Sequence, residues 1–345
     1  MDAVVIEAAD RLAIREVPVS VMGDYQARTR LVAGSICNST DRKLLEGTFP
    51  GCTNFPAVLG HEAVGEVIEV GAKVRNYHVG DLVIRPRQYY VKEVGIREYF
   101  GSFAETGLVT DQWAVMEDDP SVKPGGFLHP QQVLPPGVDA AMGVLAITLK
   151  ETLSWTHRAG IGPGMWVLVF GTGPVGAAFA MYARALGASQ VILAGRTPSS
   201  IERAVAACER GIPGCGPTAT INVAEGRVPE RVREMTGGVG VDRVIEGVGD
   251  TWIIDVGVAC LAPEGFVGVY GVPPSTQSKA AHAQDPRVRY ISPDEAEVHD
   301  EFFGMVAARR IDPFAFASHR MSVHDIGRGF NLLRDRTAFK VLLDW

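Results

Sequence analysis

The chain has 345 residues, of which 46% are hydrophobic and 21% are charged. This is an ordinary globular composition, and the length suits about two domains of roughly 150 residues each. The formal net charge is −7 and no run of lysine or arginine occurs, which argues against a nucleic-acid partner. The sequence shows neither a basic leader with an apolar core nor an apolar run near the ~18 residues of a membrane span. We therefore expect a cytoplasmic protein that does not bind a membrane.

The first part of the chain consists of short alternating segments interrupted by glycines, such as residues 63–74 and 80–86. That pattern predicts an all-β, barrel-like domain. Further along, apolar strands alternate with helical segments, namely strands at 165–170, 190–195, 241–249 and 265–273 and a helix at 176–188. Such repeats predict a doubly wound parallel sheet, and the whole chain is predicted to be an α/β protein.

The C-terminal part regains a mixed character, with a helix expected near 301–310 and a last strand at 340–345. We expect this tail to return to the first domain. The predicted boundaries are 1–140 together with 292–345 for that domain, and 141–291 for the doubly wound one.

A glycine-rich motif, GTGPVG, follows the strand at 165–170 and opens the helix after it. Gly171 permits the tight turn, Gly173 lets the backbone approach a pyrophosphate, and Gly176 allows the helix to pack closely on the strand. The helix that begins around Pro174 and Val175 offers free N–H groups to the phosphates. The motif and its setting predict a dinucleotide site.

The residues that follow the next strand bear on the choice of dinucleotide. An NAD site has a carboxylate there for the ribose hydroxyls, but this chain has Gly195, Arg196 and Thr197. Arg196 can hold a 2′-phosphate bidentately, with Thr197 or Ser199 as further donors, so NADP is favoured over NAD. The alternative is that Arg196 stacks on the adenine of either cofactor.

Cys37, His61 and Glu62 are candidates for a metal site. The five cysteines are sparse and widely spaced, which indicates reduced thiols rather than a disulfide framework. A thiolate and an imidazole are natural zinc ligands. Residue type alone does not decide the matter, because a lone cysteine or histidine is more often a packed core residue.

The motifs around these residues resemble those of the medium-chain dehydrogenase/reductase superfamily, and within it the zinc alcohol, polyol and sugar dehydrogenases. The resemblance covers essentially the whole chain and implies a GroES-like β-barrel catalytic domain and a Rossmann domain. The residues that carry it are Cys37, Gly60, His61, Glu62, Gly65, Val67, Val70, Gly71, Val74, Gly80, Asp81, Val83, the motif 171–176 and the segment 237–242.

The resemblance implies a role for each matching residue. Cys37 and His61 would bind one catalytic Zn2+, and Glu62 would be a ligand or a neighbour that exchanges with the zinc-bound water. Zinc would act as a Lewis acid on an alcohol, from which hydride passes to the nicotinamide. Ser39 would take the hydroxyl proton and relay it through the cofactor ribose, unless it is only a turn hydroxyl. Lys340 would contact the cofactor pyrophosphate, the alternative being a plain surface lysine.

One departure from the family concerns the third protein ligand. The family usually places it about two dozen residues before the glycine motif, where this chain has Ala146 or Ile147, and neither binds a metal. Glu151 is one helical turn further on, but we expect an exposed helix glutamate there. The third ligand is thus Glu62, Glu151 or none. If Glu62 binds, three ligands and a water make an open catalytic site.

Other departures affect the surroundings of the site. Residues 85–115 contain no cysteine, so we expect no structural zinc of the four-cysteine type. Arg42 stands where some relatives end their proton relay with a histidine. In this chain the proton would therefore pass directly to water. Either Asp41 or Thr40 would orient His61.

The predicted function is a zinc-dependent NAD(P) oxidoreductase that interconverts a secondary alcohol, on a polyol, cyclitol or sugar-like small molecule, with its ketone. One alternative is a zinc-free, NADPH-dependent quinone or enone reductase of the same superfamily. Another is a binding protein that keeps a dinucleotide site without catalysis. A homo-oligomer is expected, and a sheet edge near 265–273 is a candidate for pairing between subunits.

Overall fold

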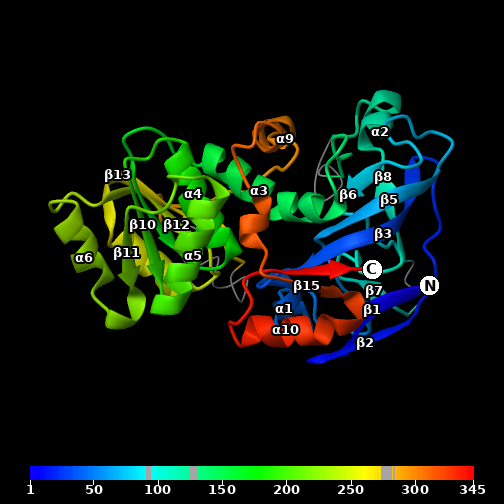
Figure 1. The fold of residues 1–345 in the computed structure, drawn as a ribbon, viewed down its shortest axis with the longest axis horizontal. Coiled ribbons are helices and arrows are strands. Elements are labelled where there is room, and N and C mark those ends of the chain that lie inside the picture. Colours follow the sequence, from blue (N-terminus) through cyan, green and yellow to red (C-terminus); the bar gives the residue numbers. More distant parts are fainter. Residues whose placement is uncertain (91–94, 124–130, 273–281, 283) are drawn as a thin grey trace. The chain divides into compact units, whose positions relative to one another are not determined.

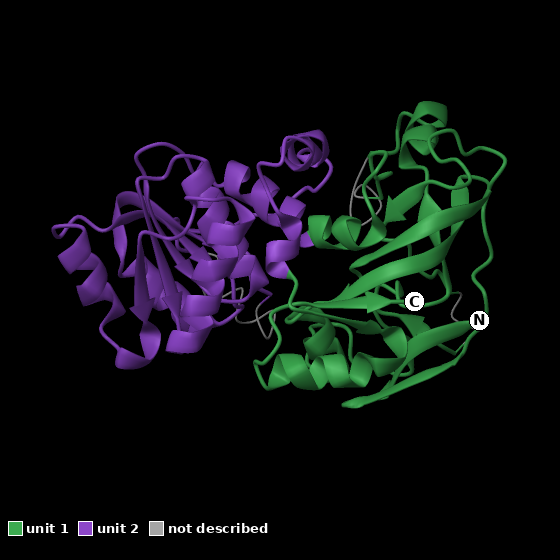
Figure 2. Ribbon diagram, in the orientation of Figure 1, with its two compact units in different colours: residues 1–147, 317–345 green, residues 148–316 purple. Residues whose placement is uncertain are grey.

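A computed structural model describes residues 1–90, 95–123, 131–272, 282 and 284–345. The chain divides into two compact units, residues 1–147 with 317–345 and residues 148–316, which Figure 2 shows in green and purple. The first unit contains both ends of the chain, and the second is one continuous segment.

The first unit is built on two sheets (Figure 1). The strands of the larger one are β3 (Gln26–Ile36), β5 (Ala63–Val70), β6 (Leu82–Ile84), β8 (Thr106–Thr110), β15 (His319–Ser322) and β16 (Val341–Asp344). Their order is β15-β16-β3-β5-β6, and β8 also pairs with β3. The smaller sheet, in the order β2-β1-β4-β7, consists of β1 (Asp2–Ala8), β2 (Arg11–Glu16), β4 (Ala57–Val58) and β7 (Arg97–Glu98). The first part of the chain is thus mainly β, as predicted, although it also contains two short helices, α1 (Thr40–Leu45) and α2 (Gln112–Asp118).

Strand β1 shows why a strand of this unit needs apolar residues on both faces. Val4 and Ile6 pack into one core cluster, whereas Ala3 and Val5 pack into another. Alternate side chains point to opposite faces of a strand, so a strand between two cores is apolar throughout.

Few helices accompany these sheets. The first unit contains α1 (Thr40–Leu45), α2 (Gln112–Asp118), the 3-10 turn η5 (Val323–Asp325) and α10 (Ile326–Arg334). A long helix, α3 (Ala140–Arg158), begins in the first unit and continues into the second.

The second unit is a six-stranded parallel sheet with helices. Its strands are β9 (Trp166–Phe170), β10 (Gln190–Gly195), β11 (Ala219–Asn222), β12 (Val241–Glu246), β13 (Leu261–Val269) and β14 (Val288–Tyr290). The order is β11-β10-β9-β12-β13-β14, and every neighbouring pair is parallel. The chain runs outward from β9 in one direction and from β12 in the other. This is the doubly wound topology, so the predicted fold class is confirmed, and ligands bind such sheets where the order reverses.

The helical elements of this unit follow the strands. They are α4 (Pro174–Ala185), α5 (Pro198–Gly211), η3 (Val223–Glu225), α6 (Val228–Met235), α7 (Thr251–Val258), α9 (His299–Ala307) and η4 (Pro313–Phe316). Among the residues that the structure describes, no helix is long and apolar enough to cross a membrane.

The second unit extends beyond the expected boundary at residue 291 and includes α9 and η4. Polar contacts with α3 account for the difference. The Ser154 hydroxyl and the Arg158 guanidinium both donate to the Glu297 carboxylate, at 2.5 and 2.8 Å, and His157 lies 3.1 Å from Glu301. At the sheet edge, β13 lies between β12 and β14, so β14 rather than the 265–269 segment forms that edge.

Candidate active site

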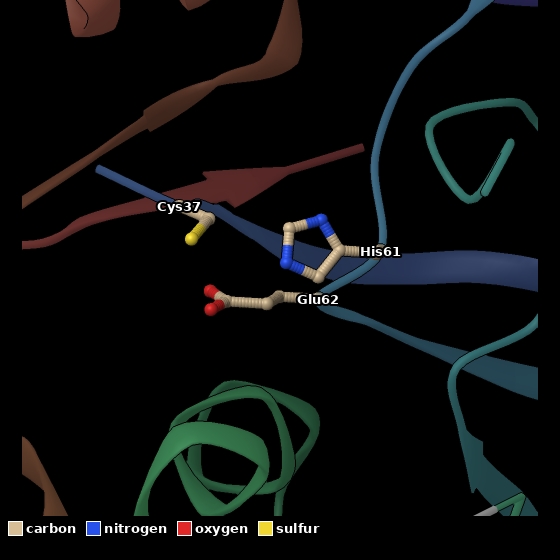
Figure 3. A group of neighbouring side chains, drawn as sticks. All are labelled: Cys37, His61 and Glu62. Atoms are coloured by element: carbon tan, nitrogen blue, oxygen red, sulfur yellow. The ribbon is translucent and has the colours of Figure 1, made fainter. Parts of the chain in front are cut away.

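The candidate metal centre lies where the ends of two strands meet (Figure 3). Cys37 follows the last residue of β3, and His61 and Glu62 directly precede β5. Because β3 and β5 are antiparallel, with Gly34 paired to Ala63, the end of β3 lies beside the start of β5. Backbone pairing therefore brings the three predicted ligands together.

The three side chains point toward a common space, as Figure 3 shows. One ligand atom from each of Cys37, His61 and Glu62 lies within 4.8 Å of those of the other two. The exposed fraction of the side chain is 12% for His61 and 4% for Glu62. A thiolate, an imidazole and a carboxylate are all donors that zinc accepts, and three protein donors leave a fourth position for water or substrate. These residues fit a catalytic zinc ion.

Asp41 orients the histidine. Its side chain is fully buried, and Nδ1 of His61 donates to Oδ1 of Asp41 at 2.9 Å. Burial lowers the pKa of His61, but the Asp41 carboxylate and the Cys37 side chain outweigh burial and raise that pKa well above its ordinary value. The contact leaves Nε2 of His61 as the nitrogen for a metal. Of the two residues considered for this role, the structure thus selects Asp41 over Thr40.

The Glu62 carboxylate is held by two other side chains. Its Oε2 accepts a hydrogen bond from the Ser35 hydroxyl and lies 2.6 Å from Nζ of Lys340. Burial raises the pKa of Glu62, but the nearby Lys340 and His61 outweigh burial and lower that pKa to about 2. Glu62 is therefore an anion at neutral pH, as a metal ligand must be.

Lys340 is not the plain surface lysine considered above, because its side chain is only 5% exposed. Burial lowers the pKa of Lys340, but Glu62, Cys37 and Asp41 outweigh burial and raise it. The ammonium group is thus a buried cation paired with a buried anion. Its expected contact with the cofactor pyrophosphate remains a prediction.

The positions considered for a third ligand before the glycine motif belong to helix α3. Ala146 and Ile147 are fully buried and apolar. Glu151 is partly buried rather than exposed, which corrects the expectation, and its Oε2 accepts a hydrogen bond from the Tyr270 hydroxyl at 2.9 Å. Within the described parts of the chain, the cluster that contains Cys37 is the only group of three or more residues suited to a metal.

Ser39 lies two residues after Cys37, at the N-cap of α1, and its hydroxyl makes no capping hydrogen bond. Arg42, one turn later, has a side chain that is 51% exposed and lies 3.7 Å from Glu46. A cavity of about 190 Å³ opens beside Cys37, and it is lined by Asp10, Cys37, Asn38, Arg42, Leu45, Glu46, Phe330, Leu333 and Arg334. The cavity beside the Cys37 thiol is therefore lined partly by polar and charged residues of the first unit.

The glycine motif has the backbone that a dinucleotide needs. Gly171 has φ +119°, in the region that glycine favours, and a Cβ on Gly176 would collide with the carbonyl oxygen of Gly171. Gly173 is the N-cap of α4, Pro174 opens the helix, and a Cβ on Gly173 would meet no atom within 4 Å. The open space over Gly173 is where a phosphate can approach the helix N-terminus.

Arg196 and Thr197 lie at the end of β10, next to this motif. Arg196 is exposed, and Thr197 is the N-cap of α5, where its hydroxyl accepts from the backbone N–H of Ser200. The hydroxyl of Ser200 in turn lies 3.0 Å from that of Thr172 in the glycine motif. The cationic side chain thus stands at the carboxyl edge of the sheet.

The sequence did not predict a role for Ser35 beside the metal centre or for Glu246 beside the glycine motif. Ser35 had no signal, because a serine in a strand is unremarkable until its partner is known. Glu246 ends β12 and is 1% exposed, and its Oε1 accepts from the backbone N–H groups of Val248 and Gly249, both at 2.7 Å. The signal available for Glu246 was an acidic residue at the end of an apolar parallel strand. It fixes the loop beside the glycine motif.

Comparison with known proteins agrees with this geometry. The family model of the alcohol dehydrogenase GroES-like domain matches residues 23–119, and that of the zinc-binding dehydrogenases matches residues 174–292. The NADP-dependent isopropanol dehydrogenase of Clostridium beijerinckii is 29% identical over 72% of this chain and 69% of its own. The putative D-xylulose reductase of Agrobacterium fabrum is 28% identical over 96% of this chain and 95% of its own.

A solved structure shows the same fold over the full length. The alcohol dehydrogenase TADH from Thermus sp. ATN1 is 26% identical and superposes with a TM-score of 0.79, covering 100% of this chain and 99% of its own. The two matched segments, 23–119 and 174–292, fall in the first and second units respectively. The chain belongs to the medium-chain dehydrogenase/reductase superfamily and is an oxidoreductase of its alcohol dehydrogenase type.

Proposed function

We propose that this protein is a zinc-dependent NAD(P) oxidoreductase that interconverts a secondary alcohol with its ketone. The observation that carries the proposal is the convergence of Cys37, His61 and Glu62 within 4.8 Å. A quinone or enone reductase that transfers hydride directly needs no soft metal ligands, so this cluster favours the zinc enzyme over that alternative.

Each residue of the cluster has a task in this reaction. Cys37, His61 and Glu62 would hold the ion, and Asp41 would keep His61 in the tautomer that presents Nε2. When bound, zinc supplies a Lewis acid that lowers the pKa of the substrate hydroxyl. Because only three protein side chains would bind the ion, the site would leave room for that hydroxyl.

Ser39 is the proposed proton acceptor. It is two residues from Cys37, and its hydroxyl is not used for capping α1. A hydroxyl at this position can take the proton of the alcohol and pass it on. Arg42 is half exposed, so the relay would end in solvent rather than at a histidine.

NADP is the proposed cofactor, in preference to NAD. Arg196 is exposed at the end of β10, where no carboxylate is present to repel a 2′-phosphate. A guanidinium can hold such a phosphate bidentately, with Thr197 beside it. The isopropanol dehydrogenase relative is itself named as NADP-dependent.

The proposed substrates are polyols, cyclitols or sugar-like secondary alcohols. The relative from Agrobacterium fabrum, named as a putative D-xylulose reductase, supports this class. The absence of a structural zinc, the cytoplasmic location and the homo-oligomeric state remain predictions.

Metal content tests the proposal most directly. Purified, chelator-rinsed wild-type protein should contain about one zinc per chain by elemental analysis, and Cys37→Ala should lose it. Cys52→Ala, which alters a cysteine outside the cluster, serves as the control. Wild-type protein free of zinc but able to reduce quinones or enones with NADPH would instead support the zinc-free alternative.

A further inference from the structure

The Glu62 carboxylate is held by one residue of strand β3 and by the residue that precedes strand β16. Ser35 is the penultimate residue of β3, and Lys340 directly precedes β16. Both side chains contact the same oxygen, Oε2 of Glu62. We propose that Ser35 and Lys340 are positioning residues that hold Glu62 as the third zinc ligand, in place of the ligand that is missing at residues 146 and 147. This inference rests on the proposed zinc site.

The backbone fixes both residues relative to Glu62. The amide N–H of Ser35 donates to the carbonyl of Glu62 at 2.9 Å, and Ser35 pairs with Leu342 of β16 on its other side. Strand β3 thus lies between the two strands whose starts carry Glu62 and Lys340. Because both neighbours are antiparallel to β3, their first residues meet at its C-terminal end.

Further hydrogen bonds hold the start of β16 in place. The side-chain amide of Asn38 donates to the carbonyl of Phe339 at 3.2 Å. The hydroxyl of Ser318 donates to the carbonyl of Lys340 at 3.1 Å and accepts from the N–H of Phe339 at 2.7 Å. Lys340 therefore extends from a backbone that is anchored from two directions.

The two contacts define how Glu62 meets a metal. Each of the side chains of Glu62 and Lys340 is about 5% exposed or less, so the ion pair is shielded from competing water. A carboxylate whose Oε2 is already engaged by an ammonium and a hydroxyl is expected to offer a metal one oxygen rather than two. Partners that orient metal-bound side chains commonly contribute about 10–100-fold to metal affinity.

This arrangement assigns Lys340 a task other than the expected one. Its Nζ lies 2.6 Å from a buried carboxylate, so a cofactor pyrophosphate would have to compete with Glu62 for the same cation. Measurements of zinc affinity and of NADPH affinity distinguish a positioning role for Lys340 from a pyrophosphate contact. Loss of a positioning residue weakens zinc binding, whereas loss of a pyrophosphate contact weakens NADPH binding.

The test measures both affinities in Lys340→Met, Lys340→Arg and Ser35→Ala. Lys73→Met is the control, because the Lys73 side chain is 50% exposed. Zinc affinity comes from competition with a chelator, and NADPH affinity comes from fluorescence of the zinc-loaded protein. We expect Lys340→Met to lose about 10–100-fold in zinc affinity and Ser35→Ala about tenfold, with the NADPH Kd changed by less than about twofold. Lys340→Arg should retain most of the wild-type zinc affinity.

Cobalt substitution gives a second readout besides activity. The visible absorption of the cobalt-loaded protein reports the ligands and geometry of the metal, so Ser35→Ala should change the spectrum while Lys73→Met should not. If Lys340→Met does not fold, Ser35→Ala carries the test alone. Unchanged zinc affinity and cobalt spectra in both variants, together with a raised NADPH Kd in Lys340→Met, would overturn the inference. A wild-type protein that binds no zinc would instead refute the proposed function.

Discussion

Nδ1 of His61 lies 2.9 Å from Oδ1 of Asp41, and the other oxygen of the same carboxylate accepts the backbone N–H of Cys37, also at 2.9 Å. One buried carboxylate therefore fixes two of the three candidate zinc ligands. Because Asp41 belongs to α1, the short helix after β3 has a direct part in building the metal centre.

Replacing Asp41 with asparagine should weaken the metal site. The amide carries no charge to stabilise the Nδ1–H tautomer of His61, so we expect zinc affinity to fall by about 10–100-fold. Chelator competition measures the change, and Asp344→Asn, which alters a surface pair with Arg320, is the control. Equal zinc affinity in Asp41→Asn and wild type would show that Asp41 has only a structural role.

Zinc affinity should rise with pH. In the metal-free protein Asp41 and Cys37 raise the pKa of His61 well above its ordinary value, so this histidine keeps its second proton to a higher pH and zinc has to displace that proton. Each proton released on binding makes affinity increase by about tenfold per pH unit, and the increase ends above the pKa of the group. Titrations with zinc between pH 6 and 9 (roughly from the ordinary pKa of histidine upward) should show this slope. A flat profile would contradict a protonated His61.

Ser39→Ala should impair turnover without affecting the metal. A general acid or base contributes about 10²–10⁴-fold, so kcat for alcohol oxidation should fall by a factor in that range while zinc content stays at the wild-type level. Ser39→Thr keeps a hydroxyl and should recover part of the rate. The proton relay would be disproved by an alanine variant with wild-type kcat and pH profile.

Arg196→Ala should change the cofactor preference. A charge-assisted hydrogen bond contributes about 1.5–3 kcal/mol, so the NADPH Kd should rise by roughly 10–100-fold while the NADH Kd changes little. Fluorescence titration with both cofactors measures this, with Arg310→Ala, an exposed arginine of the same unit, as the control. Equal losses for both cofactors would favour the adenine-stacking alternative.

Two glycines of the dinucleotide motif should respond differently to alanine. Gly176→Ala places a methyl group against the carbonyl oxygen of Gly171, so we expect a loss of about 1–3 kcal/mol in the free energy of unfolding. Gly173→Ala adds a methyl group to open space and should leave stability nearly unchanged while weakening cofactor binding. Urea unfolding and NADPH titration separate the two effects. Similar stability of the two variants would contradict the packing role of Gly176.

The sequence alone predicted the features that depend on local pattern. Gly171, Gly173 and Gly176 follow an apolar strand and precede a helix, and this order is visible without tertiary structure because turn, helix start and strand are contiguous. The pairing of Cys37 with His61 and Glu62 was also predicted, although it required the surrounding motifs rather than residue type.

The tertiary structure decided which side chains share a contact across strands. Lys340 lies 278 residues from Glu62 in sequence, and Ser35 lies 27 residues from it. Their meeting depends on β3 pairing with both β5 and β16 in one register, since a shift of one residue would turn each side chain to the opposite face. Asp41 is on helix α1 and Glu151 is on helix α3, so their contacts depend on helix packing instead. Only the folded chain therefore decided that Asp41 rather than Thr40 contacts His61, and that Glu151 contacts Tyr270.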